Sequence, residues 1–112
     1  MISVVYSTKK DKPEFKKHIE ETCGYKKIEI IQIENDGEMS LTQAYNKGLE
    51  IASNDLVVFC HDDIIFDKKN WANKIIKLFN RNPEYGIIGI AGTTDLIDGR
   101  WWTIKESMNG IV

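Results

Sequence analysis

A short apolar run that ends in three polar side chains constrains this sequence more than any other stretch. Residues 56–60 are Leu-Val-Val-Phe-Cys, and His61, Asp62 and Asp63 follow at once. An unbroken run of branched and aromatic residues is typical of a strand buried on both faces, as in a parallel sheet covered by helices. Open α/β sheets bind their ligands at the carboxyl ends of the strands. The run therefore predicts a buried strand with a candidate ligand site at its end.

The rest of the chain alternates between strand and helix patterns. Apolar runs predict further strands over residues 2–6, 28–33 and 85–92. Apolar residues at helical spacing predict helices over residues 13–23, 41–52 and 68–81. Alternating strands and helices imply a mainly parallel, Rossmann-like sheet with right-handed crossovers and helices on both faces. We therefore predict one α/β domain over residues 1–112, built in three α/β/α layers.

The second predicted helix has a clear start and one unusual residue. Ser40 followed by Gln43 is the pattern of a capping box. Gly48 lies inside the helical pattern, where glycine costs about 1 kcal/mol relative to alanine. We therefore expect another part of the chain to approach the helix closely at Gly48.

Polar side chains collect where the predicted strands end. Ser7 and Thr8 follow the first strand, and Asn35 and Asp36 follow the second. The carboxyl ends of parallel strands meet at one edge of the sheet, which is also where His61 begins its polar cluster. Polar residues scattered over a surface would not follow the strands in this way. The pattern predicts a ligand site, although the acidic turn at residues 34–38 taken alone is equally consistent with a solvated loop.

The His-Asp-Asp cluster has the side chains of a metal site. Two carboxylates and an imidazole can hold a hard or borderline divalent cation. Alternate residues of an extended segment point to the same side, so His61 and Asp63 would face a ligand together while Asp62 turns away. One or two protein ligands suit Mg²⁺ or Mn²⁺ whose coordination is completed by substrate phosphates. The sequence has no P-loop, closed zinc set or Gly-x-Ser-x-Gly elbow, which argues against those chemistries.

Composition narrows the function classes further. A net charge of −2 and a pI near 5.7 give no electrostatic footprint for nucleic acid. No apolar stretch approaches the roughly 20 residues that cross a bilayer, and the N-terminus has no basic region typical of a signal peptide. We therefore expect a cytoplasmic location. Cys23 and Cys60 lie far apart in apolar surroundings, which favours two reduced thiols over a disulfide or a metal pair.

Taken in order, the motifs resemble the nucleotide-binding half of an inverting family-2 glycosyltransferase with the GT-A fold, a nucleotide-diphospho-sugar transferase. Matching segments cover the first strand with its uridine-contacting turn, the acidic turn, the Arg-Asn-x-Gly helix, the Asp-x-Asp strand and the strand after it: residues 2–8, 33–37, 44–52, 56–63 and 89–92. His61 at the start of the Asp-x-Asp motif resembles the StrF-like branch of this group. The resemblance extends over residues 2–102.

The resemblance implies a role for each polar cluster. The implied partner is a nucleotide-diphosphate sugar, with a UDP-sugar favoured, and the acceptor is not indicated. The implied metal is Mg²⁺ or Mn²⁺. Asp63 and His61 would be the metal-binding residues, and the nucleotide-binding residues would be Ser7, Thr8, Asn35, Asp36, Asn46 and Asp62.

Two departures from the family pattern affect the functional prediction. Tyr45 stands where the family motif has arginine, and Lys47 is a candidate substitute for the missing cation. The family's acceptor-binding portion, which supplies the catalytic base, follows the last matched strand. Only residues 93–112 remain there, so the chain corresponds to the nucleotide-binding part of longer members, and no catalytic base is assigned.

Several alternatives remain open at this point. The carboxylates in the tail are Asp95, Asp98 and Glu106, and the tandem Trp101 and Trp102 could stack on a sugar, pack in a core or join two copies of the chain as a homo-oligomer. A non-catalytic nucleotide-sugar-binding module would keep the nucleotide site without transfer. A metal-dependent phosphoesterase or nucleotidyltransferase would use the same carboxylates for different chemistry.

Overall fold

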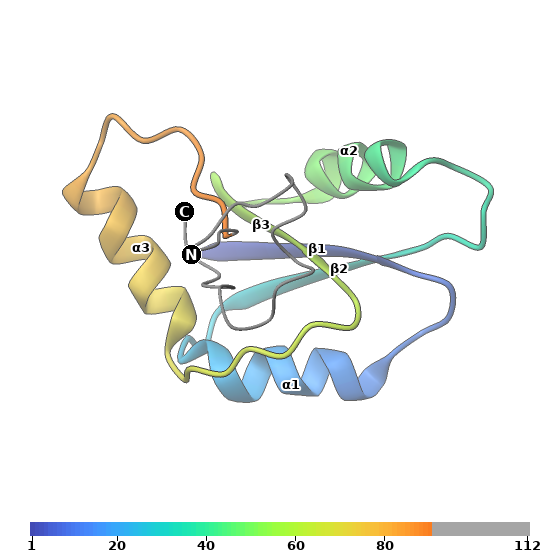
Figure 1. The fold of residues 1–112 in the computed structure, drawn as a ribbon, viewed down its shortest axis with the longest axis horizontal. Helices are drawn as coiled ribbons and strands as arrows, with labels where there is room; N and C mark the ends of the chain where they lie inside the picture. The colour runs from blue at the N-terminus through green and yellow to red at the C-terminus, as the bar shows by residue number, and fades with distance from the viewer. Residues whose placement is uncertain (91–112) are drawn as a thin grey trace, which may run out of the picture. The chain divides into compact units, whose positions relative to one another are not determined.

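The computed structural model describes residues 1–90 of the chain, in which strands and helices alternate (Figure 1). Two compact units are distinguished, Met1–Asn80 and Arg81–Val112, and the whole sheet belongs to the first. In chain order the elements are β1 (Ile2–Thr8), α1 (Pro13–Cys23), β2 (Ile28–Glu34), α2 (Leu41–Ile51), β3 (Leu56–His61) and α3 (Trp71–Arg81).

The three strands form one parallel sheet in the order β2-β1-β3. Ile2 pairs with Ile28 of β2 on one side and with Leu56 of β3 on the other, so the strands start level. Their carboxyl ends are therefore level as well, with Ser7 opposite His61. In the described part of the chain β1 is the central strand, and β3 pairs with β1 alone.

The position of β3 corrects one expectation from the sequence. Its apolar run was predicted to be buried on both faces, but Phe59 is 44% exposed and the other apolar side chains of β3 are only half-buried. The fully buried strand is β1, where Ile2, Val4 and Val5 have no exposed surface. The apolar runs of β1 and β3 are similar, so composition alone does not tell which of them takes the central place.

Alternating residues of β1 contribute to two separate apolar clusters, one on each face of the sheet. Ile2, Val4 and Tyr6 pack with Phe15, Ile19 and Cys23 of α1 and with the start of α3. On the other face, Val5 packs with Ile31, Ile33 and Ala44 of α2. Figure 1 shows α1 and α2 on opposite sides of the strands. The predicted α/β/α layering and mainly parallel Rossmann-like sheet are confirmed.

The α2 helix has both features predicted for it. Ser40 Oγ accepts a hydrogen bond from the Gln43 amide (3.1 Å), and Gln43 Oε1 accepts one from the Ser40 amide (2.8 Å), which completes the capping box. A Cβ atom placed on Gly48 would overlap Cγ1 of Val5. Gly48 therefore allows α2 to lie directly against the central strand, as expected.

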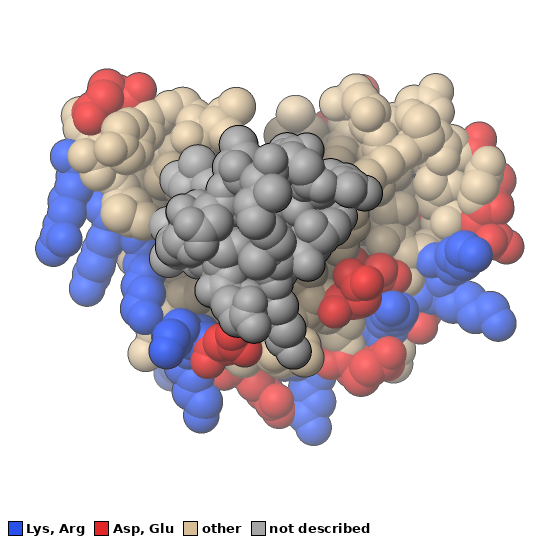
Figure 2. Space-filling model, in the orientation of Figure 1, with Lys and Arg blue, Asp and Glu red and all other residues tan. Residues whose placement is uncertain are grey.

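The α3 helix begins at Trp71, later than the sequence pattern suggests. Asn70 has a left-handed backbone (φ 61°), which a right-handed helix cannot include. Its amide donates to the Thr22 carbonyl oxygen (2.7 Å), and Trp71 Nε1 donates to Thr22 Oγ1 (3.0 Å), so the start of α3 is anchored on α1. Lys77 is exposed on this helix, and Figure 2 shows basic side chains extending into solvent on this side.

A predicted fourth strand is not found in the described residues. Residues 85–90 have no strand conformation, and residues 91–92 lie outside the described range. A strand requires a backbone partner, and no ladder of the described sheet includes this segment. Ile87 is accordingly 92% exposed. No helix among residues 1–90 has the length and apolar character needed to cross a membrane.

Candidate functional site

The strand ends at the carboxyl edge of the sheet are joined by a backbone contact. The Asn35 amide donates a hydrogen bond to the Thr8 carbonyl oxygen (2.8 Å), which ties the end of β2 to the end of β1. The loop after β1 leads to α1 on one face, and the loop after β2 leads to α2 on the other. Ligands of α/β sheets bind where the following loops diverge in this way.

An ion pair joins the first loop to the end of β3. Lys12 Nζ lies 3.1 Å from Asp62 Oδ2, and it also donates to the main-chain carbonyl oxygen of Asp62 (3.3 Å). The side chains of Lys12 and Asp62 are 34% and 27% exposed. Both groups are therefore fixed relative to each other and still open to solvent.

The environment of Asp62 favours its ionised form. Partial burial raises the pKa of this carboxyl group, but hydrogen bonds from Thr8 and Lys12 and the charge of Lys12 outweigh that effect and hold the pKa below its ordinary value. Thr8 is 3% exposed, and its hydroxyl also lies 2.9 Å from the Lys10 carbonyl oxygen. The buried Thr8 hydroxyl therefore lies between the loop after β1 and the Asp62 carboxylate.

A half-buried glutamine side chain fixes the backbone of Lys12. Gln32 Oε1, from β2, accepts hydrogen bonds from the Lys12 amide (3.2 Å) and from the Tyr6 hydroxyl (2.9 Å). Burial, reinforced by the charge of Asp11 and other nearby groups, raises the pKa of Tyr6, so its hydroxyl remains a donor. The network of Tyr6, Gln32, Lys12, Asp62 and Thr8 reaches all three strands. It holds the loop after β1 in one position.

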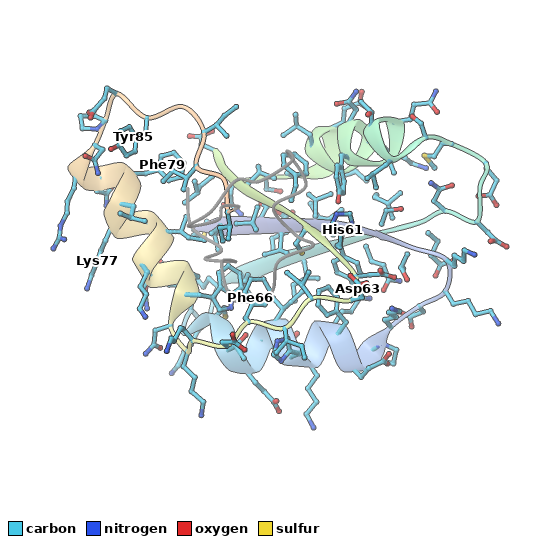
Figure 3. All side chains as sticks on the ribbon, viewed as in Figure 1. His61, Asp63, Phe66, Lys77, Phe79 and Tyr85 are labelled. Atoms are coloured by element: carbon cyan, nitrogen blue, oxygen red, sulfur yellow. The ribbon has the colours of Figure 1, made fainter. Side chains whose placement is uncertain are left out.

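His61 and Asp63 do not belong to the same extended segment. The β3 strand ends at His61, and Asp62 and Asp63 form a turn, so the expected alternation does not reach Asp63. Asp62 has a partner of its own, because its carboxylate is held by Lys12. Figure 3 shows His61 on β3 and Asp63 beyond its end, and both side chains are exposed.

The donor set can be tested against the predicted metal. Among residues 1–90 no group of three or more His, Cys, Asp or Glu side chains is placed to hold a metal ion. His61 and Asp63 offer an exposed imidazole and an exposed carboxylate at the same edge. Two such donors fit Mg²⁺ or Mn²⁺ only if other oxygens, such as those of a phosphate, complete the coordination.

The acidic turn after β2 is closed by side-chain hydrogen bonds and carries exposed carboxylates. The Asn35 side chain donates to the Met39 carbonyl oxygen (2.8 Å) and accepts from the Met39 amide (3.1 Å). These two bonds close the turn, which passes through Gly37 at φ 91°. The carboxylate of Asp36 is exposed. Glu38 accepts a hydrogen bond from the Asp36 amide (2.6 Å), so the Asp36 backbone is held while its own carboxylate stays available to a ligand.

Tyr45 on α2 reaches the end of β3 and packs there. Its hydroxyl donates to the Cys60 carbonyl oxygen (3.1 Å), and its ring centroid lies 5.2 Å from that of Phe59. Asn46 and Lys47 are exposed on α2, and no contact within the described range links either of them to the carboxyl edge. Lys12, from the loop after β1, is the lysine with a contact to the His-Asp-Asp cluster in the described part of the chain.

The contact between Lys12 and Asp62 has no clear signal in the sequence. Lys12 lies in a charged run with Lys9 and Lys10, and its type and spacing do not distinguish it from them. Pro13 is the one local signal, because a residue before proline is restricted to extended conformations. The acidic and aromatic candidates Asp95, Asp98, Glu106, Trp101 and Trp102 lie outside the described residues.

A second polar network lies at the opposite, amino end of the sheet. Glu29 of β2 accepts hydrogen bonds from the Ser3 hydroxyl (2.5 Å) and the Ser53 amide (2.9 Å), which lower the pKa of its carboxyl group. Asn54 donates to Ser3 Oγ (3.0 Å). The contacts tie β1 and β2 to the segment that enters β3. The lowered pKa of Glu29 is thus explained by hydrogen bonds that hold the sheet together. The carboxyl edge therefore remains the candidate functional site.

Comparison with known proteins identifies the family. A family model described as "Glycosyltransferase like family" matches residues 5–112. Searches of curated proteins and of solved structures gave no match. The closer resemblance to the StrF-like branch stays a prediction. With nearly all of its length matched, the chain belongs to this glycosyltransferase-like family.

Proposed function

We propose that the domain binds a nucleotide-diphosphate sugar at the carboxyl edge of the sheet and takes part in transfer of the sugar to an acceptor. Family membership supports the chemistry. The observation that carries the location is the convergence of Thr8, Lys12 and Asp62 at the ends of β1 and β3, within 3.3 Å between Lys12 and Asp62. The charged groups of Lys12 and Asp62 are held in place and partly exposed to solvent, at the edge where α/β sheets bind ligands.

Different residues at this edge would contact different parts of the nucleotide. Asp36 has an exposed carboxylate that can accept a hydrogen bond from a nucleobase N–H group, and Asn35 holds the turn that presents it. Ser7 and Thr8 border the nucleotide where β1 ends. Asp62 offers its second carboxylate oxygen to a ribose hydroxyl. Uracil has such an N–H group at N3, so Asp36 can bind the base of the UDP-sugar that the family resemblance favours.

His61 and Asp63 are the residues that would hold Mg²⁺ or Mn²⁺. The bound ion would neutralise negative charge on the diphosphate leaving group. His61 and Asp63 lie beside the Lys12–Asp62 pair in sequence and at the end of the same strand. Their exposure leaves room for the phosphate oxygens that must complete the coordination.

In an inverting transfer, the acceptor hydroxyl oxygen bonds to the anomeric carbon while the bond from that carbon to the diphosphate breaks. The nucleoside diphosphate leaves, and a carboxylate within hydrogen-bond reach takes the hydroxyl proton. We assign no residue of the described range to this last step. The candidates by residue type are Asp95, Asp98 and Glu106 of the tail.

Calorimetric titration with UDP, GDP and UDP-sugars, with and without Mn²⁺, tests the proposal. We expect UDP to bind in the presence of Mn²⁺ and Asp63→Asn to weaken that binding at least tenfold. Asp67→Asn, which changes an exposed carboxylate of the following loop, is the matched control. Failure of every nucleotide to bind would overturn the proposal.

Product analysis on the same samples separates the three chemistries. Sugar transfer, or slow donor hydrolysis that releases the sugar, identifies a glycosyltransferase. Binding without turnover identifies residues 1–112 as a nucleotide-sugar-binding module that does not transfer the sugar by itself. Cleavage within the diphosphate, with the sugar still attached to phosphate, identifies a phosphoesterase or nucleotidyltransferase.

A further inference from the structure

The Lys12 ammonium group has one N–H donor that is not used within residues 1–90. A lysine ammonium has three N–H donors. Two of them are directed to Asp62, at Oδ2 (3.1 Å) and at the main-chain oxygen (3.3 Å). Within residues 1–90 the third donor has no partner, and 34% of the side chain is exposed. The ammonium group can therefore receive an anionic ligand without leaving Asp62.

The main chain of Lys12 is fixed from both sides. Its amide donates to Gln32 Oε1 (3.2 Å), and its carbonyl oxygen accepts from the amides of Phe15 (3.1 Å) and Lys16 (3.2 Å) in the first turn of α1. Pro13 restricts the preceding residue to extended conformations, and Lys12 has φ −123° and ψ 78°. A long side chain on a fixed backbone, held at its end by Asp62, loses little further freedom when a ligand binds.

The carboxylates at this edge favour a nearby cation. Asp36, Asp62 and Asp63 all lie at the carboxyl edge, and a nucleoside diphosphate brings further negative charge. Tyr45 of α2 reaches the end of β3, but its hydroxyl donates to the Cys60 carbonyl oxygen and brings no positive charge. Lys12 supplies a positive charge in contact with the His-Asp-Asp cluster.

We propose that Lys12 binds the diphosphate of the nucleotide donor through its third N–H group, and that Asp62 is the positioning residue that holds the ammonium group in place. The proposal rests on the proposed function and adds a cationic phosphate contact from the loop after β1. It also assigns to Lys12 the role that the sequence analysis suggested for Lys47.

A comparison of UDP with uridine isolates the phosphate contact. Both ligands are titrated at saturating Mn²⁺ into the wild-type chain, Lys12→Met, Lys12→Arg and the control Lys77→Met. Lys77 is exposed on α3, so its substitution removes the same charge elsewhere (Figure 3). Loss of one charge-assisted hydrogen bond predicts that Lys12→Met weakens UDP binding about tenfold or more. Uridine binding should change less than twofold.

The remaining variants distinguish loss of the contact between Lys12 and the diphosphate from a general loss of structure. Lys12→Arg should keep UDP affinity within a few-fold of wild type, and Lys77→Met should leave it unchanged. Asp62→Asn removes the ion pair with Lys12 but keeps the hydrogen bond to the main-chain oxygen of residue 62. Lys12 is then held less firmly, and UDP binding should weaken more than uridine binding. A circular dichroism spectrum for each variant verifies that the fold is retained.

The binding results distinguish failure of the proposed function from failure of the role of Lys12. If wild type binds neither UDP nor GDP, the proposed function fails and the role of Lys12 fails with it. If wild type binds UDP and Lys12→Met binds it equally well, the proposed function stands and the role of Lys12 is overturned. Equal weakening of UDP and uridine in Lys12→Met also overturns it, because a general loss of structure would act on both ligands.

Discussion

The ammonium group of Lys12 lies 3.1 Å from the Asp62 carboxylate, and these two residues link the start of α1 to the end of β3. The pair depends on the parallel register, which places the ends of β1 and β3 level. It joins the loop after the central strand to the His-Asp-Asp cluster. The candidate site therefore has a fixed centre rather than a set of separate exposed side chains.

The ion pair predicts a pH-dependent contribution to stability. The pKa of Asp62 is lower in the folded chain than in the unfolded chain, so its contribution is complete above the unfolded pKa and is lost as pH falls through the folded one. Asp62→Asn should cost up to about 1 kcal/mol at neutral pH, since the pair is partly exposed. The difference from wild type should shrink below about pH 4.

Urea unfolding of wild type and Asp62→Asn across this pH range measures the effect. Asp67→Asn controls for the removal of a carboxylate without this ion pair. A stability difference that stays constant from pH 7 to pH 3 would contradict the assignment. A double-mutant cycle with Lys12→Met should give a coupling energy of about 0.5–1 kcal/mol.

Gly48→Ala should destabilise the fold even though alanine is the better helix former. Propensity alone would stabilise the helix by about 1 kcal/mol. The added Cβ would overlap Val5, and overpacking of this kind typically costs about 1–3 kcal/mol. Thermal unfolding of Gly48→Ala should therefore occur at a lower temperature than that of wild type. Lys47→Ala on the exposed side of α2 should be neutral, and a stabilised Gly48→Ala variant would refute the close contact.

Asn35 and Asp36 should respond differently to substitution although they are neighbours. Asn35→Ala removes both hydrogen bonds to Met39 and should lower the free energy of unfolding by about 1–3 kcal/mol. Asp36→Asn changes an exposed carboxylate, so stability should stay within about 0.5 kcal/mol of wild type. Under the proposed function it should weaken UDP binding. Chemical denaturation and UDP titration of the two variants compare them directly, and equal destabilisation by both would contradict the turn geometry.

The Cys60 thiol should react slowly despite its place beside His61. Burial, with a smaller contribution from the Asp62 charge, raises the pKa of Cys60 to about 12, so the thiolate is scarce at pH 8. Cys23 is fully buried, and both thiols are free. Iodoacetamide should modify the native chain at pH 8 much more slowly than the urea-unfolded chain, as followed by mass spectrometry. Rapid modification of Cys60 in the native chain would contradict the burial of its thiol.

Sequence patterns predicted those parts of the fold that depend on local interactions. The capping box at Ser40 involves residues three positions apart, and the constraint at Gly48 follows from a helical pattern interrupted by glycine. The α/β layering follows from the alternation of strand and helix patterns, which the structure confirms. These features need no knowledge of strand order.

Features set by strand order and strand ends could not be predicted in the same way. The contact between Lys12 and Asp62 joins residues 50 positions apart, and it exists because β3 pairs with β1. The turn at Asp62 and Asp63 ends the alternation on which the pairing of His61 with Asp63 was based. The binding roles assigned to the eight site residues stay predictions.

The most direct test of the central claim maps the nucleotide site by two-dimensional ¹H–¹⁵N NMR. Titration of the labelled chain with UDP and Mg²⁺, which is diamagnetic, should shift the amide signals of Thr8, Lys12, Asn35 and residues 61–63 at the carboxyl edge. The signals of Glu29, Ser53 and Asn54 at the amino end should stay in place. Absence of any shift at saturating UDP, or shifts confined to the amino end, would contradict a nucleotide site at the carboxyl edge.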